Sequence, residues 1–272
     1  MKIDTIELME IARELRIDII KMLHKSKSGH TGGSLSAIDI LTCLYFSEMN
    51  ISADDPGNPK RDRFVLSKGH AAPALYAVLA HAGFFNKDVL DTLRKTDTIL
   101  QGHPDMNLTP GVDMSTGSLG QGLSAANGMA LALRLDNSPA RVYAIMGDGE
   151  QQEGQIWEAA MTAAHYKLDN ICAFVDKNGL QIDGKVEDVM NVGPLSDKWR
   201  AFGWHVIEID GHNMDEILSA LEEARKTQGK PTAIIANTTK GKGFTFCAGK
   251  VCYHGTPPSD KDLEEGLKEI NE

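Results

Sequence analysis

No apolar run in the sequence is long enough to cross a membrane, and the amino terminus alternates charged and apolar residues where a secretory signal would have an apolar core. Blocks of basic residues are missing too, and the 272-residue chain has a formal net charge of −10. An acidic chain without a basic face is not expected to take nucleic acid as its main partner. The absence of these features predicts a soluble cytoplasmic protein whose partners include neither a membrane nor a nucleic acid.

Cysteine is scarce, and its spacing suits neither disulfides nor zinc. The four cysteines form no CxxC motif, and Cys43 and Cys172 stand within apolar runs, so buried reduced thiols are favoured. The nine histidines lack the HxxxH and HxxEH spacings of zinc enzymes. The glycines after the first expected strand do not follow the GxGxxG pattern, which argues against a dinucleotide-binding oxidoreductase.

What the chain does contain is a regular alternation of strand and helix patterns. Residues 5–25 have the apolar spacing of an amphipathic helix, residues 86–95 are expected to be helical, and Ser36 with Asp39 forms a capping box that predicts a helix to about Phe46. Short apolar runs predict strands at residues 63–66, 142–146, 171–175, 205–209 and 232–236. We therefore predict one α/β domain over residues 1–272, a mostly parallel sheet with helices on both faces.

Two of these strands end in residues suited to a metal ion. The run 142–146 leads into Gly147-Asp148-Gly149-Glu150, and the run 171–175 leads, after two residues, into Asn178. If the two strands are parallel neighbours, the carboxylate and the amide meet at one edge of the sheet. Such oxygen donors suit Mg²⁺ or Ca²⁺, with ligand phosphate oxygens completing the coordination. Taken singly, an Asp or Asn beside glycine is most often only a turn.

Further candidate residues follow other strands or lie in glycine-rich loops. Lys68, His70, His212 and Lys240 come after expected strands, at the edge where parallel sheets bind ligands. A histidine beside a glycine in a loop can reach a cleft and handle protons, as His30, His70, His103 and His254 could. Residues 116–122 open a helix with free N–H groups that would suit an anion.

Six motifs occur in order along the chain: Ser28-Gly29-His30, Ser67-Lys68-Gly69-His70-Ala71-Ala72-Pro73, Gly102-His103-Pro104, Thr116-Gly117-Ser118-Leu119-Gly120-Gln121-Gly122, Gly147-Asp148-Gly149-Glu150 and His254-Gly255. Together they resemble the amino-terminal, diphosphate-binding half of a transketolase, and the resemblance extends from about residue 8 to residue 258. The resemblance implies a thiamine diphosphate-binding fold.

The resemblance also implies roles for individual residues. It implies thiamine diphosphate as cofactor, with Mg²⁺, or Ca²⁺ or Mn²⁺ in its place, held by Asp148, Asn178 and the carbonyl of Leu180. Catalytic roles toward the sugar hydroxyls would fall to His30, His103 and His254, since imidazoles can accept and return protons. The cofactor contacts it implies are Lys68, His70, Gly117, Ser118, Leu119, Gly149, Glu150, Asn178, Lys240 and His254.

The chain departs from the family pattern in two places. Gly33 stands where many relatives have a hydroxyl residue near the cofactor. The pyrimidine-binding and carboxyl-terminal domains of a full-length transketolase are absent from the sequence, and with them the glutamate that activates the cofactor. We therefore expect these domains on a separate carboxyl-terminal subunit, in an α₂β₂ heterotetramer active at the interface between subunits.

The activity that the resemblance implies is transfer of a two-carbon ketol unit from a ketose phosphate to an aldose, as in the pentose phosphate pathway. Two alternatives stay open at this point. The chain could be a subunit of another thiamine diphosphate enzyme, such as a 2-oxo acid dehydrogenase α chain or a protein like deoxyxylulose-phosphate synthase. It could also be a noncatalytic subunit that binds the cofactor for regulation.

Overall fold

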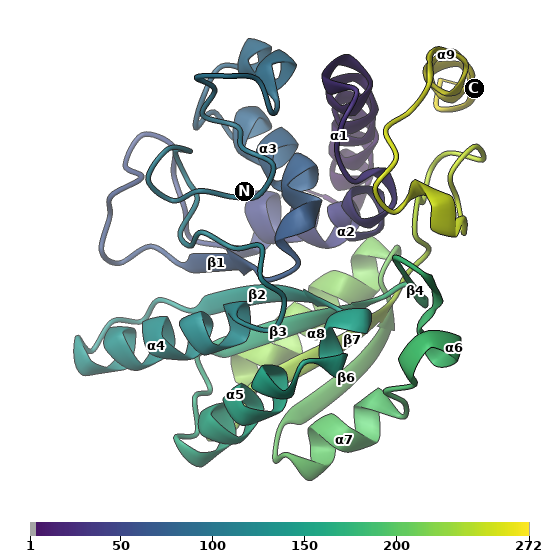
Figure 1. Cartoon of the computed structure of the whole chain (residues 1–272). Coiled ribbons are helices and arrows are strands. Elements are labelled where there is room, and N and C mark those ends of the chain that lie inside the picture. Colours follow the sequence, from purple (N-terminus) through teal and green to yellow (C-terminus); the bar gives the residue numbers. More distant parts are fainter. Residues whose placement is uncertain (1–3, 272) are drawn as a thin grey trace.

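Five strands form one parallel sheet in the order β1-β2-β3-β7-β6 (Figure 1), and the computed structural model describes residues 4–271 of the chain. Every neighbouring pair in this sheet is parallel, so the carboxyl ends of the strands lie at one edge. The predicted strands are all present. Their bounds are Arg63–Leu66 (β1), Val142–Gly147 (β2), Ile171–Lys177 (β3), His205–Asp210 (β6) and Thr232–Asn237 (β7).

Helices cover both faces of the sheet, as the sequence predicted. Figure 1 shows α4 (Gly122–Leu135) and α5 (Gly154–His165) on one side, and α1 (Thr5–Ser26), α2 (Thr31–Cys43) and α3 (Ala72–His81) on the other. The face with α1, α2 and α3 is completed by α8 (Met214–Lys226), and the face with α4 and α5 by α7 (Leu195–Ala201).

Alternating residues of the central strands point to the two faces, which gives the domain two apolar cores. Tyr143 and Ile145 of β2 pack with α1, α2, α3 and α8, whereas Val142, Ala144 and Met146 pack with α4, α5 and α7. Since both faces are buried, the strands read as continuous apolar runs in the sequence. This explains why their positions were predictable.

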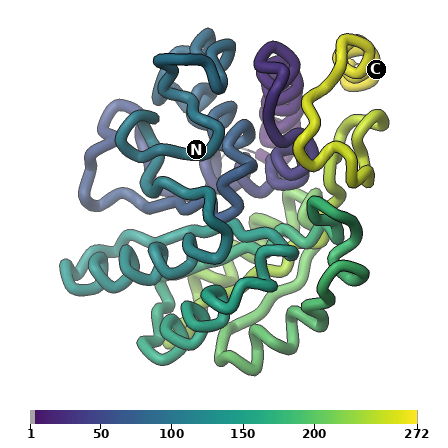
Figure 2. The backbone as a smooth tube through the Cα atoms, in the orientation of Figure 1, coloured from purple at the N-terminus to yellow at the C-terminus, as the bar shows by residue number. Residues whose placement is uncertain are grey.

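Shorter elements surround the sheet edge. A hairpin of β4 (Leu180–Gln181) and β5 (Gly184–Lys185) is followed by α6 (Val186–Met190). The carboxyl-terminal helix α9 (Asp260–Glu269) lies beside α1 in Figure 2, where Arg13 donates a hydrogen bond to the Asn271 side chain (3.1 Å). Single turns of other helix types are formed by Leu44–Glu48, Gly69–Ala71, Lys87–Thr92, Gly149–Gln152 and Val251–Tyr253.

The capping box predicted at Ser36 and Asp39 is wrong. Helix α2 begins five residues earlier, at Thr31, so Ser36 is inside the helix and its hydroxyl donates to the Asp176 carboxylate (2.6 Å). Every residue of α2 is buried, and this packing outweighs the poor helix propensity of its two glycines. Similarly, the helix expected over residues 86–95 is only the short 3₁₀ segment Lys87–Thr92.

The cysteines and the helix lengths agree with the sequence-based expectations over residues 4–271. The four cysteines are free thiols, and Cys43, Cys172 and Cys247 are buried. Among residues 4–271, none of the helices combines the length and the apolar character needed to span a membrane.

Candidate cofactor site

Asp148 lies where β2 ends, at the centre of the site. Its neighbour Gly147 is paired with Asp176 of β3, so the ends of the two strands are in register. The Asp148 carboxylate accepts hydrogen bonds from the backbone N–H groups of Gly149 (2.8 Å) and Gly179 (2.6 Å). Burial, with a smaller contribution from the charge of Asp176, nevertheless raises the pKa of Asp148 to about 6. A cation bound to this carboxylate would offset the free-energy cost of burying its negative charge.

Asn178 and Leu180 bring two more oxygen atoms to the same place. The side-chain oxygen of Asn178 accepts from the Leu180 N–H (3.1 Å), and the Leu180 carbonyl accepts from Lys240 Nζ (3.0 Å). Both residues line a cavity of about 320 Å³ together with Asp148. A carbonyl oxygen has two lone pairs, so the Leu180 carbonyl can bind a cation while it keeps Lys240.

The donor set at this edge fits a hard divalent cation. It consists of one carboxylate, one amide oxygen and one backbone carbonyl, which suits Mg²⁺ in a site completed by phosphate and water. Within residues 4–271, no cluster of three or more His, Cys, Asp or Glu side chains is arranged to hold a metal ion. The chemistry of the donors therefore fits a metal bound jointly by the chain and a phosphate ligand better than a metal bound by side chains alone.

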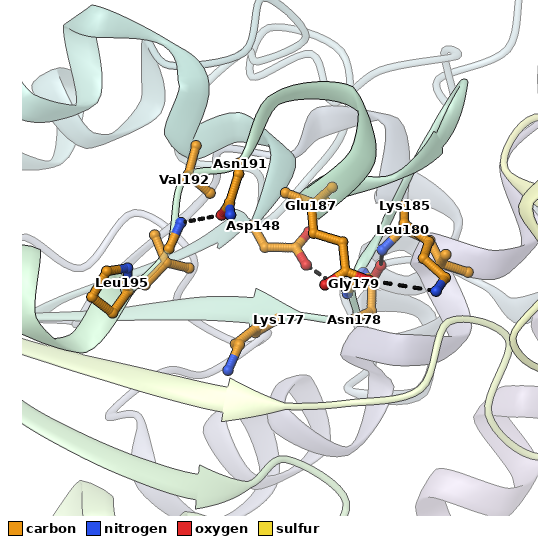
Figure 3. Close-up of a pocket in the computed structure, with 13 residues that line it drawn as sticks. Asp148, Lys177, Asn178, Gly179, Leu180, Lys185, Glu187, Asn191, Val192 and Leu195 are labelled. Atoms are coloured by element: carbon orange, nitrogen blue, oxygen red, sulfur yellow. Dashed lines mark hydrogen bonds and ion pairs between the residues drawn. The ribbon is translucent and has the colours of Figure 1, made fainter.

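A second cavity, of about 450 Å³, adjoins the first at Asp148 (Figure 3). It shares Asp148, Asn178 and Leu180 with the first cavity and extends toward α6 and α7. Figure 3 shows Lys177 and Lys185 on its wall. The three oxygen donors thus lie between two spaces large enough for parts of one extended ligand.

Three imidazoles also line the first cavity. The ring centroids of His30, His70 and His254 are 5.1 to 5.3 Å apart. Burial, and then nearby positive charge, lowers the pKa of His30 to about 4 and that of His254 to about 3, and the pKa of His70 also falls well below its usual value. All three rings are neutral at pH 7 as a result. Such rings can both accept and donate a hydrogen bond.

His30 has a buried ring nitrogen, Nδ1, for which the described part of the chain provides no hydrogen-bond partner. A buried polar atom left unpaired costs free energy, which a ligand hydroxyl could recover. His254 is different, because its Nδ1 contacts Lys240 Nζ at 2.7 Å. The three rings therefore offer distinct hydrogen-bonding positions to one ligand.

The glycine-rich segment before α4 forms another part of the wall. Gly117 and Leu119 line the cavity, whereas Ser118 is exposed and is not among the lining residues. His103 is exposed and packs against Gly117, where an added Cβ would come within 3.2 Å of the imidazole. His103 is not among the residues that line the cavity and makes no ring contact with His30, His70 or His254, but it is near enough to His30 to contribute to the lowering of the His30 pKa.

Lys68 and Glu150 line the cavity, but their polar atoms are bonded to other residues of the chain. Lys68 Nζ forms a buried ion pair with Asp176 and donates to the Gly33 carbonyl (2.9 Å). Burial favours the neutral form of Asp176, but Lys68 outweighs it and keeps the pKa of Asp176 below its usual value. Sequence reasoning missed Asp176 as a site residue, although an acidic residue that ends a buried apolar strand is itself a signal of a partner nearby.

Glu150 holds three segments of the cavity wall together. Its carboxylate accepts from the Ser67 hydroxyl and from the backbone N–H groups of Gly120 (2.9 Å) and Gly147 (2.9 Å). These donors lie after β1, before α4 and at the end of β2. His212, by contrast, follows β6 and lies outside the cavity, where it contacts Asp39 and the Thr239 N–H.

A parallel sheet that presents oxygen donors at two adjacent strand ends, with a glycine-rich helix start and neutral imidazoles around one cavity, defines the class of thiamine diphosphate-binding proteins. The comparison with protein families agrees. Residues 6–270 match the family described as "Transketolase, thiamine diphosphate binding domain".

Individual relatives support the same family. The chain is 51% identical to a 6-deoxy-6-sulfo-D-fructose transketolase subunit of Clostridium sp., covering 97% of this chain and 96% of the relative. It is 43% identical to an apulose-4-phosphate transketolase subunit of Phocaeicola vulgatus, covering 100% of this chain and 96% of that relative. Transketolase from Leishmania mexicana has the same fold, with a TM-score of 0.92 at 30% identity, and the chain covers 42% of its length.

The chain belongs to the transketolase family, as its amino-terminal, thiamine diphosphate-binding part. The fold class, the family and the type of subunit predicted from the sequence are therefore confirmed. The roles of the individual site residues stay predictions.

Proposed function

We propose that the chain acts with a separate carboxyl-terminal subunit to transfer a two-carbon ketol unit from a ketose to an aldose. The two relatives that have nearly the same length are named as transketolase subunits, which supports a partner for this chain too. The partner would supply the pyrimidine-binding domain and the glutamate that activates the cofactor. We propose an α₂β₂ assembly in the cytoplasm, where free thiols such as those of Cys43 and Cys172 persist.

The observation that carries the proposal is the meeting of Asp148, Asn178, Leu180 and the imidazole cluster at one cavity. We assign Asp148, Asn178 and the Leu180 carbonyl to Mg²⁺, which would hold the diphosphate end of the cofactor. Gly117, Leu119 and Gly149 line the same cavity, and we assign them to contacts with that end of the cofactor. Bound thiamine diphosphate supplies the electron sink for the carbon–carbon bond that breaks.

The chain's own residues orient the sugar and move protons. We assign His30, whose Nδ1 has no hydrogen-bond partner within residues 4–271, and His254 to the sugar hydroxyls, where an imidazole within hydrogen-bond reach can accept a proton and return it. His103 would contribute from the exposed rim. Lys68 and Glu150 serve the cofactor indirectly, because their polar atoms are engaged by Asp176, Gly33, Ser67, Gly120 and Gly147.

For the donor we propose a ketose with an acidic group at the far end. The names of the two relatives specify a sulfo sugar in one case and a sugar phosphate in the other, so both substrates end in a strong anion. A phosphate monoester and a sulfonate differ in charge at pH 7, about −1.5 to −2 against −1, but both are tetrahedral anions with three terminal oxygens, so one type of basic pocket can take either.

The test is an assay of ketol transfer by the chain mixed with its partner, thiamine diphosphate and Mg²⁺, with ketose phosphates and ketose sulfonates as donors. Asp148→Asn should abolish transfer and raise the cofactor Kd at least about 100-fold, since it removes the only carboxylate in the donor set. Asp54→Asn, at an exposed aspartate outside the cavity, is the matched control and should change neither quantity. Unchanged cofactor affinity in Asp148→Asn would contradict the proposal.

A further inference from the structure

Asp39 is a buried carboxylate that lies outside the cofactor cavity and joins two cationic or polar side chains. It belongs to α2 and is 4% exposed. One of its oxygens, Oδ2, accepts hydrogen bonds from Arg16 Nη2 of α1 (2.6 Å) and from His212 Nδ1 (2.7 Å). We call Arg16, Asp39 and His212 the Asp39 triad. Helix packing alone does not require such a buried charged group, so it needs a reason.

The outer ends of the Asp39 triad both reach the backbone of the loop at residues 239–242. The Thr239 N–H donates to His212 Nε2 (2.8 Å), and Arg16 Nε donates to the Lys242 carbonyl (3.2 Å). A backbone N–H can only donate, so His212 Nε2 must carry the lone pair, and the ring proton is then on Nδ1, facing Asp39. One carboxylate thus sets the tautomer of the histidine and the orientation of the arginine.

Lys240 lies between the two residues that the triad holds. Its Nζ reaches the Leu180 carbonyl (3.0 Å) and His254 Nδ1 (2.7 Å), and its side chain lines the cofactor cavity. Lys240 is 2% exposed, and its Nζ is fixed by these two contacts. A shift of its backbone would strain or break them and change where the ammonium group meets the metal and cofactor region.

The loop is held by backbone hydrogen bonds as well as by the Asp39 triad; the Lys240 carbonyl, for example, accepts from the Gly249 N–H (2.8 Å). The loop contains Gly241 and is followed by Gly243, and their φ values of +80° and +102° are positive values that glycine adopts without strain; residues 239–242 form neither strand nor helix. Arg16 packs on it directly, since a Cβ added at Gly243 would come within 2.7 Å of Arg16 Cδ. Further backbone bonds do exist, such as Gly241 N–H to the Gly32 carbonyl (3.0 Å). The triad adds side-chain anchors on either side of Lys240.

We propose that the Asp39 triad is a positioning device for the cofactor site: Arg16, Asp39 and His212 hold the loop at residues 239–242 so that Lys240 is presented to thiamine diphosphate. This inference rests on the proposed function, because it assumes that the cavity binds this cofactor. It assigns a role to three residues that do not line the cofactor cavity and line a separate one of about 580 Å³.

The experiment measures the Kd of Mg²⁺–thiamine diphosphate for the chain assembled with its partner subunit. His212→Phe removes the acceptor for the Thr239 N–H and should weaken cofactor binding about 10-fold, the lower end of what supporting hydrogen bonds contribute to a metal or catalytic site. His212→Gln can accept from Thr239 and donate to Asp39 through its amide, so it should restore most of the affinity. His205→Phe, at the start of the same strand β6 and outside the cavity, is the matched control.

The dependence on Lys240 separates positioning from general stability. In a Lys240→Ala background, His212→Phe should weaken cofactor binding less than 2-fold, because the side chain that the triad positions is gone. Arg16→Gln provides a second, independent variant should His212→Phe not fold: it frees the Lys242 carbonyl and should weaken cofactor binding several-fold. Amide hydrogen exchange of residues 239–243 should accelerate in His212→Phe and in Arg16→Gln, and not in His205→Phe.

Two results would overturn the inference and can be told apart. If both triad variants bind the cofactor as wild type does, or if His212→Phe costs the same factor with and without Lys240, the triad does not act through Lys240. If the wild-type assembly itself binds no thiamine diphosphate, the proposed function fails and the positioning role fails with it.

Discussion

Replacing Lys68 by methionine should cost the chain a large part of its stability. The Lys68 side chain is 2% exposed and that of its partner Asp176 is 0% exposed, so the substitution leaves a buried carboxylate without its counter-charge. Removing one partner of such a pair typically costs about 3 to 5 kcal/mol. Asp176 keeps hydrogen bonds from Ser36 and Thr238, so we expect the lower end, about 3 kcal/mol.

Urea denaturation at pH 7 measures this cost from the shift in midpoint at constant slope. Adding Asp176→Asn to Lys68→Met removes the stranded charge and should recover about 2 kcal/mol. Lys177→Met, at the next residue after Asp176, changes an exposed side chain whose Nζ donates to the neutral Asn237 side chain, so it should stay within about 0.5 kcal/mol of wild type.

The stability lost in Lys68→Met should depend on pH, and the direction of that dependence can be derived. In wild type the pKa of Asp176 is lowered, so its contribution to stability is present above its unfolded pKa and is lost in acid. Without Lys68, burial raises that pKa instead, and protonation in acid relieves the cost. The deficit of Lys68→Met should therefore shrink between pH 7 and pH 4. A deficit under about 1 kcal/mol, or one that does not change with pH, would refute the reasoning.

Three further predictions concern the cavity. Since His30 has a pKa of about 4, its NMR signals should show a neutral ring at pH 6. Arg94→Met should raise that pKa, because the positive charge of Arg94 is the largest cause of the lowering after burial. An unchanged midpoint of the His30 titration in Arg94→Met would contradict this. Gly69→Ala would place a Cβ 2.8 Å from the Gly117 backbone nitrogen, so it should cost about 1 to 3 kcal/mol and weaken cofactor binding, whereas Gly57→Ala, with open space around it, should do neither. Chelation of divalent cations should release the cofactor from the assembly and added Mg²⁺ should restore it, as judged by equilibrium dialysis; retention after chelation would argue against a bridging metal.

The strands and their ends were predictable because both signals are local. A strand buried on both faces is a continuous apolar run, and a glycine with a polar residue at its end marks the edge where ligands bind. Asp148 and Asn178 could be assigned to adjacent strand ends in this way. His30, His70, His103 and His254 were singled out together because each lies beside a glycine, and the structure brings the rings of three of them, His30, His70 and His254, into contact.

What escaped prediction depends on contacts between distant segments. The start of α2 at Thr31 follows from complete burial of the helix, which no local cap signals. The partner of Lys68 is 108 positions away, on β3. For His103, which has the same glycine signal as the other histidines, the contact of its ring with Gly117 could not be read from the sequence, and its role toward the sugar stays a prediction. The short segments α6 and α7 have neither the length nor the periodicity for a sequence-based prediction.

The position of β7 in the sheet has a consequence for how the chain folds during its synthesis on the ribosome. In the sheet β7 lies between β3 and β6, although it is made last, so the edge of β3 has no partner until residue 237 has been synthesised. At typical rates of translation the 60 residues that separate the ends of β3 and β7 take about 3 to 12 s. During this interval an apolar strand edge is open to wrong pairing. Nascent chains of this protein should therefore need protection until the last strand is inserted, and slower translation in this stretch should lower the yield of folded protein.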